Sequence, residues 1–270
     1  MTGTKAFSVR TENIELYSEY LDRLVKIDFY LPPGFDSQTD FSLLIINDGQ
    51  DLQAMGFDLL LAELQDQIRP LICAGIHCSA DRKMEYGIAE IPDFKGRGAK
   101  AKLYTDFILN EFLPFSKEFF QTKSFSERSY AGFSLGGLSA LDIVWNNPTL
   151  FSKAGVFSGS LWWRSIDQHD KEYDDNKHRI MHQLIRNGAF KPNLDFFFQC
   201  GNMDETKDRN NNGIIDSIDD TQDLIKELKA KGYSDEHILY YEMKDGRHDV
   251  ATWARAFPAF LKWGWSLKRS

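Results

Sequence analysis

The sequence predicts an α/β protein with a mostly parallel sheet and helices on both of its faces. From residue 41 to 265, short apolar runs alternate with amphipathic stretches of helical period. Ahead of them, alternating apolar positions in 7–18 and 22–31 indicate an antiparallel strand pair, ended by Pro32-Pro33-Gly34. Strand–helix alternation of this length is typical of a parallel sheet that is covered on both faces.

The elements follow in a simple order. Further strands are expected at 41–46, 70–76, 128–133, 154–157, 194–200 and 238–243, and helices at 55–68, 100–120, 135–146, 221–231 and 250–265. We assign residues 1–270 to a single domain, with a partly helical, cap-like excursion at about 160–190 and a loop insertion at about 205–220. Because ligands of such sheets bind beyond the carboxyl ends of the strands, the residues that follow each strand are the functional candidates.

Charge, apolar runs and cysteine content exclude several classes of protein and partner. The chain has 40 acidic and 32 basic residues, and its net charge of −8 argues against nucleic acid as a partner. No apolar run approaches the roughly 18 residues of a membrane span, and three cysteines without a C-x-x-C pair predict no disulfide framework. No signal peptide is evident, so we expect a cytoplasmic protein, or a periplasmic or secreted one if a signal was removed. Oligomeric state stays open.

One motif indicates a nucleophile. Gly132-Phe133-Ser134-Leu135-Gly136 is a G-x-S-x-G pattern between a predicted strand and a predicted helix. The turn at such a junction is so sharp that the serine backbone is strained and its flanking positions must be small. The serine hydroxyl then projects above the sheet at the positive end of the following helix. We therefore expect Ser134 to be the nucleophile.

A serine nucleophile requires a base and an acid that orients the base. With G-x-S-x-G at a strand–helix junction, the chain order is serine, acid, histidine. Of six histidines, only His248 lies between the last strand and the last helix. The acid is expected after strand 194–200, where Asp204 is our choice and Glu205 the alternative.

The oxyanion hole needs two backbone N–H groups. Leu135, which follows the nucleophile, is expected to supply one of them. The loop after strand 41–46 is expected to supply the other, from Gly49 or Gln50, and the sequence does not decide between them.

The chain resembles the esterase D-like α/β-hydrolases, a group that includes enterochelin, feruloyl and acetylxylan esterases. The resemblance runs from about residue 22 to 265 and rests on these segments: Asn47-Asp48-Gly49-Gln50, Asp81-Arg82-x-x-Glu85-Tyr86, Ala131 to Gly137, Phe151 with Lys153-Ala154-Gly155, Ser158 to Trp163, Cys200-Gly201-x-x-Asp204 and Gly246-x-His248-Asp249. It implies the α/β-hydrolase fold and the same triad. Two departures are Asn47, where the family usually has His, and Gly159, where a Pro is common.

Three side chains are candidates for substrate contact. Trp162 and Trp163 follow the strand at 154–157 and are expected either to form one wall of an acyl or aryl site or to pack beneath the 160–190 segment. Arg82 follows another strand, where it is expected to meet a substrate carboxylate or to pair with a nearby Glu and order its loop.

A second motif predicts a calcium loop. Residues 208–219 fit D-x-N-x-N-G-x-I-x-x-x-D, the EF-hand spacing with glycine at position 6. The expected ligands are Asp208, Asn210, Asn212, the Ile214 carbonyl, Asp216 and Asp219. Asp replaces the usual Glu at position 12. A structural Ca²⁺ here would hold the loop that carries Asp204, while the chemistry itself needs no cofactor.

Together these features predict a serine hydrolase that cleaves a small-molecule or carbohydrate ester through an acyl-enzyme. The alternatives are a thioesterase or peptidase on the same triad, and a non-catalytic, calcium-dependent binding protein of the same fold. The sequence does not identify the ester.

Overall fold

An eight-stranded sheet organises the molecule. The computed structural model describes residues 9–36 and 41–267, and its strands run in the order β1-β2-β4-β3-β5-β6-β7-β8. β1 and β2 pair antiparallel, β2 is antiparallel to β4, and the remaining pairs are parallel. Their bounds are β1 (Arg10–Ser18), β2 (Arg23–Leu31), β3 (Ser42–Asn47), β4 (Leu71–Ile76), β5 (Arg128–Phe133), β6 (Lys153–Phe157), β7 (Asp195–Met203) and β8 (Ile238–Arg247). The predicted fold class is confirmed.

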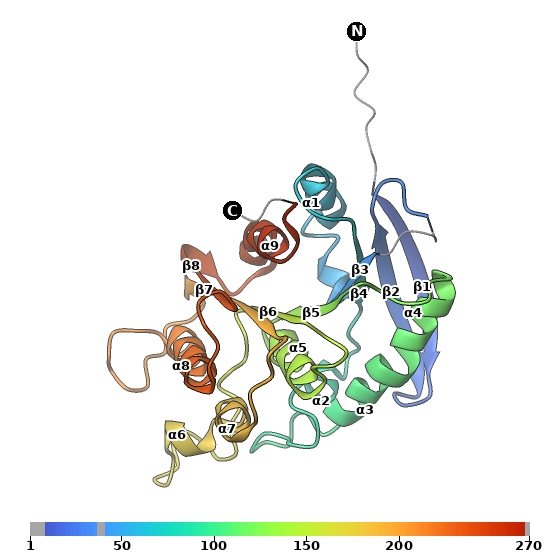
Figure 1. Ribbon diagram of the computed structural model, residues 1–270. Coiled ribbons are helices and arrows are strands. Elements are labelled where there is room, and N and C mark those ends of the chain that lie inside the picture. The colour runs from blue at the N-terminus through green and yellow to red at the C-terminus, as the bar shows by residue number, and fades with distance from the viewer. Residues whose placement is uncertain (1–8, 37–40, 268–270) are drawn as a thin grey trace.

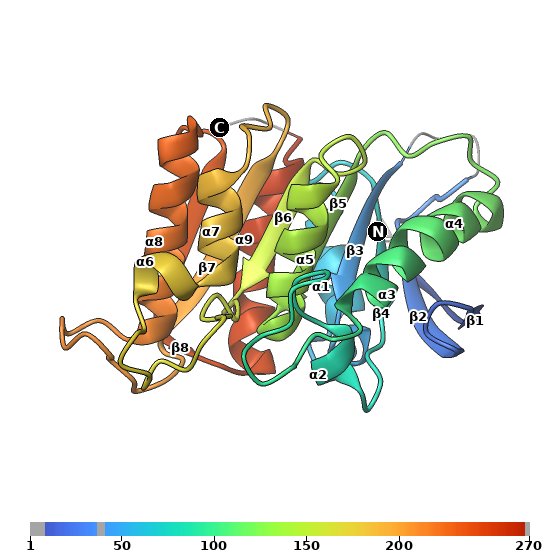
Figure 2. The same ribbon diagram turned by 90° about the horizontal axis from the view of Figure 1, so that it is seen from below.

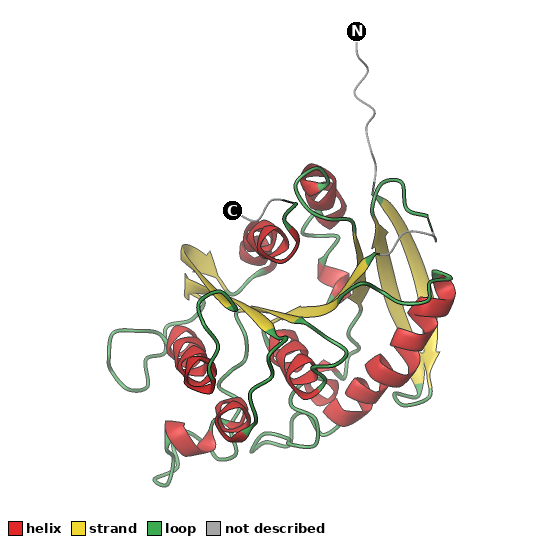
Figure 3. Cartoon of the chain, viewed as in Figure 1, coloured by secondary structure: helices red, strands yellow, loops and turns green. Residues whose placement is uncertain are grey.

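Helices cover both faces of the sheet. Helices α1 and α9 lie on one face, and α3 with α4, α5 and α8 lie on the other (Figures 1 and 3). The helical bounds are η1 (Gly49–Asp51), α1 (Phe57–Leu64), α2 (Arg82–Glu85), α3 (Ala101–Asp106), η2 (Phe107–Phe112), α4 (Leu113–Phe119), α5 (Leu135–Asn146), α6 (Asp175–His178), α7 (Ile180–Asn187), α8 (Asp216–Lys231) and α9 (Val250–Trp265).

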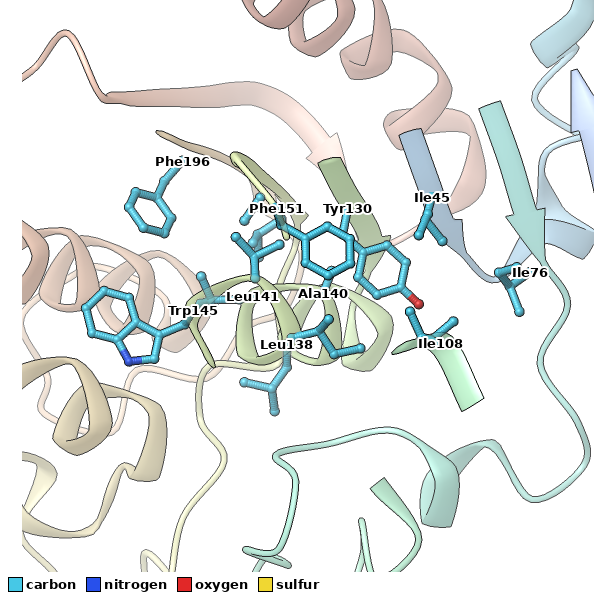
Figure 4. Close-up of a cluster of buried hydrophobic side chains, with 14 of the residues drawn as sticks. Ile45, Ile76, Ile108, Tyr130, Leu138, Ala140, Leu141, Trp145, Phe151 and Phe196 are labelled. Atoms are coloured by element: carbon cyan, nitrogen blue, oxygen red, sulfur yellow. The ribbon is translucent and has the colours of Figure 1, made fainter. Parts of the chain in front are cut away.

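Each face has its own apolar core. Beneath α5, the side chains of Leu138, Leu141 and Trp145 belong to one cluster with Tyr130 and Phe151 (Figure 4). On the other face the core is strongly aromatic, and Phe157 of β6 stacks on Phe257 of α9 with 5.0 Å between ring centroids. Such ring pairs add about 0.5–1.5 kcal/mol to the burial of their area. The two cores fix the helices against the strand ends that carry the site.

The predicted elements differ from the structure mainly at their ends. Helix 55–68 is shortened to α1, and helix 100–120 is interrupted by the π-helical segment η2. Pro114, the second residue of α4, has no N–H to donate, and the hydrogen-bond pattern widens in the segment before it. Helix α8 begins at Asp216, inside the predicted calcium loop. The short helices η1 and α2 were not predicted.

The excursion at about 160–190 is partly helical, as expected. Its helix α7 packs on the outer side of the helical layer beside α8 (Figures 1 and 2). The end of α7 contacts α5, since a Cβ on Gly188 would lie 2.9 Å from the indole of Trp145. The stretch before α6 passes beside the carboxyl ends of the central strands (Figure 2).

Candidate active site

Ser134 lies in a strained turn between β5 and α5. Its backbone has φ 55° and ψ −120°, a conformation that non-glycine residues rarely adopt. The turn has no room for side chains on either side: a Cβ on Gly132 would fall 2.3 Å from the Gly136 carbonyl oxygen, and a Cβ on Gly136 would fall 2.7 Å from Asp48. The Ser134 N–H donates to the carbonyl of Phe157 at 2.8 Å. The sharp turn predicted from the two glycines is present.

The strand register brings Asp204 and His248 together. Met203 and Arg247, the last residues of β7 and β8, are partners in the parallel ladder. The next residues along the chain are Asp204 and His248, so both side chains emerge at the same edge of the sheet. Their charges interact, since each shifts the pKa of the other.

Burial sets the protonation of this pair. It raises the pKa of Asp204, while Ser158, the Gly201 backbone and His248 oppose that shift. Burial also lowers the pKa of His248, with Asp204 opposing, so the imidazole is neutral at neutral pH. Both carboxylate oxygens of Asp204 are buried and complete no hydrogen bond of good geometry. A buried carboxylate in this state costs free energy until an N–H donor reaches it, and His248 is the neighbouring donor.

Glu205, the alternative acid, faces elsewhere. Burial raises its pKa, and the charges that act on it next are those of Asp216, Asp220 and Lys207, on the side of the 208–219 loop. His248 is not among the groups that shift it. Asp204 is therefore the better partner for the histidine.

The residues predicted to supply the oxyanion N–H groups stand at two separate helix starts. Leu135 is the first residue of α5, and Gly49 and Gln50 open η1. The first N–H groups of a helix have no acceptor within that helix. Only glycine fits at position 49, because a Cβ there would lie 2.3 Å from the carbonyl carbon of Gly75.

Asn47, at the end of β3, is a buried hydrogen-bonding node. Its amide nitrogen donates to the Gly136 carbonyl at 2.8 Å, and its oxygen accepts from the hydroxyls of Tyr104 and Tyr130 at 2.6 and 2.9 Å. The side chain therefore joins the loop of η1 to the start of α5. An amide both donates and accepts, so this one side chain can make all three bonds at once.

Arg82 is bound to the protein itself. Its guanidinium donates to both carboxylate oxygens of Asp48 at 2.7 and 2.6 Å and to the Phe133 carbonyl at 3.3 Å. The pKa of Arg82 is raised despite its burial, through Asp48. Glu85 is paired with Arg23 instead, at 2.7 Å. The Arg–Glu pair considered from the sequence is thus replaced by an Arg82–Asp48 pair that orders the η1 loop.

The two tryptophans occupy different environments. Trp163 is fully buried, its ring N–H donates to the Ile91 carbonyl at 3.1 Å, and its ring fills the space over Gly87 and Gly98. Of the two roles expected for Trp163, this placement favours packing over a substrate wall. Trp162 is half-buried and lines a cavity.

The cavity beside Trp162 has a volume of about 300 Å³ and mixed charge. The Arg97 guanidinium lies 4.6 Å from the Trp162 ring centre, and Arg164 lies 5.9 Å from it. Glu205 also lines the cavity. Asp216 and Lys207 also line it, so this cavity lies between the excursion and the start of the 208–219 loop.

Sequence reasoning gave no role to three residues that the structure places at the site. The Ser160 N–H donates to the Ser134 carbonyl at 3.0 Å, and the two hydroxyl oxygens lie 3.5 Å apart. Ser158 lies beside Asp204, and Trp253 contacts both Ser158 and His248. The two serines belong to a segment that resembles the esterase family, which was a usable signal. Nothing in the sequence marked Trp253, because it looks like any other apolar position of a helix.

The predicted calcium ligands lie on one loop. Asp208 accepts from the backbone N–H groups of Asn212 and Gly213 at 3.1 and 2.9 Å, and Gly213 has a φ of 85°. The side-chain amides of Asn210 and Asn212 both donate to Asp219 Oδ2, at 2.7 and 2.8 Å.

Asp216 behaves differently from the other predicted ligands, because it accepts from the N–H of Arg209 at 2.8 Å. Across residues 9–36 and 41–267, no group of three His, Cys, Asp or Glu side chains is arranged to hold a metal ion. The loop therefore brings three of the ligand positions, 210, 212 and 219, to one point and leaves Asp216 engaged elsewhere.

A buried ion-pair network joins this loop to the excursion. Arg179 and Arg209 both bind Asp220 Oδ1, at 2.7 and 2.6 Å, and Arg209 also binds Asp175 at 2.9 Å. Asp220 is almost completely buried. Removal of one partner from such a network leaves an uncompensated buried charge, so the loop and α6 are held in a fixed relation.

The strand order and the site together define an α/β-hydrolase fold. Solved structures share it. The enterobactin esterase of Shigella flexneri, determined in the presence of enterobactin, superposes with a TM-score of 0.72 at 20% identity over 94% of this chain and 58% of that chain. A ferulic acid esterase gives a TM-score of 0.70 at 16% identity, covering 95% and 97% of the two chains. The siderophore hydrolase EstB of Aspergillus nidulans gives 0.69 at 17%, covering 100% and 99%.

Residues 18–263 match the model of the Esterase family, described as "Putative esterase". The chain belongs to this family and is a carboxylic-ester hydrolase. Its curated relatives include the Bacillus subtilis (strain 168) proteins YbbA and YjcH, both carrying the description "Uncharacterized protein". YbbA is 24% identical over 91% of this chain and 94% of its own length, and YjcH is 24% identical over 92% and 94%. Among the described residues, no helix combines the length and apolarity of a membrane span.

Proposed function

We propose that this esterase acts by acyl transfer to water through Ser134, His248 and Asp204. The observation that supports it most directly is the convergence of three strand ends: Ser134 in its strained turn after β5, Asp204 after β7 and His248 after β8. The neutral imidazole is in the protonation state that a general base requires.

In this mechanism the Ser134 oxygen attacks the ester carbonyl carbon while His248 takes the hydroxyl proton. His248 then gives that proton to the leaving alcohol as the carbon–oxygen bond of the ester breaks, which leaves an acyl-enzyme. Water attacks the acyl group in the same way and releases the acid. The N–H of Leu135, with a second from Gly49 or Gln50, stabilises the negative oxygen of each tetrahedral intermediate.

Labelling with a fluorophosphonate probe tests the nucleophile directly. The wild-type chain is expected to carry one adduct on Ser134, and Ser134→Ala to carry none. The same substitution should lower kcat on 4-nitrophenyl acetate by several orders of magnitude. Ser152→Ala, a change at a part-buried serine remote from the turn, is the matched control. A wild-type chain without an adduct would favour the non-catalytic binding protein instead.

We infer that the acyl or alcohol part of the ester occupies the cavity beside Trp162. The cavity is large enough for one aromatic or sugar ring, and its lining residues Trp162 and Glu205 are close in sequence to Ser160 and Asp204. A panel of acyl chain lengths, feruloyl esters, acetylated sugars, siderophore esters, thioesters and peptides identifies the class. Trp162→Ala should raise KM for the preferred ester and leave fluorophosphonate labelling intact.

We further propose that the 208–219 loop binds Ca²⁺ as a structural ion. Its donors are oxygens, which hard cations prefer, and the turn at Gly213 has the expected positive φ. Asp208, Asn210, Asn212, the Ile214 carbonyl and Asp219 would hold the ion, with Asp216 released from Arg209 or acting through water. The ion would supply no chemistry to the ester reaction. It would stiffen the segment between Asp204 and α8.

A further inference from the structure

Trp253, in the first turn of α9, contacts the surroundings of every triad member. Its ring stacks on Phe133, the residue before Ser134, with 5.0 Å between centroids and 23° between planes. It meets the His248 ring edge to face at 5.3 Å. Its ring N–H donates to the Ser158 hydroxyl oxygen at 3.0 Å. One side chain therefore packs against two of the three catalytic loops and binds a third element beside Asp204.

Ser158, which accepts the hydrogen bond from Trp253, has an unusual backbone conformation. It directly follows β6, is 2% exposed and has a φ of 46°. Glycine adopts this region freely, whereas a serine there carries backbone strain. The Ser158 N–H donates to the Gln199 carbonyl of β7 at 2.8 Å, which fixes the residue against the strand that leads to Asp204. The presence of a side chain at this strained position therefore needs a reason.

The direction of the hydroxyl proton supplies that reason. An indole N–H only donates, so the Ser158 oxygen is the acceptor of the Trp253 bond and its own hydrogen is directed to another group. The Asp204 carboxylate is its neighbour, and Ser158 lowers the pKa of that carboxyl against the effect of burial. Both Asp204 oxygens are buried and still need donors.

We propose that Trp253 and Ser158 are positioning residues for the triad acid. The indole orients the Ser158 hydroxyl toward one oxygen of Asp204, which leaves the other oxygen for the ring N–H of His248. The inference rests on the proposed function only for the role of the Asp204–His248 pair.

A measurable consequence follows for protonation of the pair. A hydrogen bond to the carboxylate stabilises its charged form, so loss of the Ser158 hydroxyl makes the Asp204–His248 pair bind a proton more readily. The other charged groups that face the pair are Arg82 and Asp249, and the variants below leave both in place. The apparent pKa of the pair should rise, and the acid limb of kcat/KM should move to higher pH.

The test compares Ser158→Ala and Trp253→Phe with two matched controls. Ser129→Ala removes another buried hydroxyl, one with no partner, from β5, and Trp145→Phe trims another buried indole, on α5. The His248 titration is read by NMR in enzyme without substrate, with the signal assigned by its loss in His248→Gln. Then kcat, KM and the pH profile are measured on 4-nitrophenyl acetate.

We expect Ser158→Ala to raise the His248 midpoint and to lower kcat about 10- to 100-fold, as for loss of one hydrogen bond to a charged group. KM should change by about twofold or less, because the hydroxyl does not contact substrate. Trp253→Phe should shift the midpoint in the same direction by a smaller amount, since it keeps the ring contacts and loses only the N–H. Both controls should titrate as the wild type does.

A Ser158→Ala midpoint and acid limb equal to those of the wild type and of Ser129→Ala would overturn the proposal. If Ser158→Ala does not fold, the Trp253→Phe variant is used instead, and a midpoint equal to that of the wild type and of Trp145→Phe would overturn the proposal. If the wild type neither hydrolyses esters nor labels at Ser134, the proposed function fails, whereas the NMR titration still tests the positioning of the Asp204–His248 pair.

Discussion

Gly201 and Gly246 lie in backbone contact between the ends of β7 and β8. A Cβ on Gly201 would fall 2.4 Å from the carbonyl carbon of Gly246 and 2.7 Å from Asp204 Oδ1. Two strands approach this closely only where neither residue has a side chain. The contact brings the Asp204 loop and the His248 loop to one place.

Gly201→Ala should therefore damage both stability and activity. The added methyl group forces the β7 and β8 ends apart, at a cost of about 1–3 kcal/mol of unfolding free energy. Displacement of Asp204 should lower kcat at least about tenfold. Urea unfolding and kinetics on 4-nitrophenyl acetate measure the two effects. Gly264→Ala is the control, because its nearest neighbour atom is 3.5 Å away in Lys153. Full activity in Gly201→Ala would contradict the role of this contact.

The acid limb of the pH profile should follow His248. Burial lowers the pKa of its imidazole below the ordinary 6.5, so the limb should have its midpoint below pH 6.5. Asp249 raises this pKa through its negative charge. Asp249→Asn should thus move the limb to still lower pH, because without that negative charge the imidazolium is less stable and more acid is needed to protonate His248.

The Asp249→Asn change is chosen to spare the fold. The Asp249 side chain caps α9 by accepting from the Thr252 N–H at 2.8 Å, and Asn caps helices equally well. Asp245→Asn, an exposed charge change in the same turn that pairs with Arg255, is the control and should leave the limb in place. A shift of the Asp249→Asn limb to higher pH would show that another group controls it.

Arg82→Ala should destabilise the chain. It leaves the Asp48 carboxylate, whose side chain is 2% exposed, as an unpaired buried charge, which costs about 3–5 kcal/mol. Adding Asp48→Asn should recover part of the loss. Thermal unfolding of the single and double variants measures this. An unchanged Tm, with KM raised only for anionic esters, would instead support the substrate contact expected from the sequence.

Calcium should stabilise the chain if the loop binds it. At free Ca²⁺ of 100 times Kd, a single site adds about 2.7 kcal/mol, or about 5–10 °C in Tm for a domain of this size. Differential scanning fluorimetry with Ca²⁺ and with EGTA measures the difference. Asp208→Ala should abolish it, and Asp235→Ala, which removes an exposed charge, should keep it. Equal Tm values of the wild type in both solutions would rule the site out.

Local signals predicted β5, the Ser134 turn and α5 to the residue, because glycines and apolar periodicity act within a few positions of one another. Asp204 and His248 were predicted to lie together only because each follows a strand, and the carboxyl ends of parallel strands meet at one edge of a sheet. The difference between Trp162 and Trp163 was out of reach, since two adjacent residues of one type are distinguished only by Gly87 and Gly98 from a distant segment.

Ion pairs between residues far apart in the sequence could not be predicted either. Nothing in the sequence around Arg82 selects Asp48 over Glu85, because the choice depends on how η1 and α2 meet in space. The start of α8 at Asp216 was missed because that residue was already assigned to the loop pattern, and a residue can serve both as loop ligand and as the first residue of a helix.

The strand order separates the catalytic groups in time as well as in sequence. During synthesis β5 and its serine emerge when β1 to β4 are already available as neighbours, so half of the sheet can assemble around the nucleophile. Asp204 and His248, the proposed acid and base, arrive with β7 and β8, which join at the far edge of the sheet. Under the proposed mechanism, a nascent chain that has folded only as far as β5 lacks both proposed partners of Ser134, so activity requires β7 and β8 to be in place.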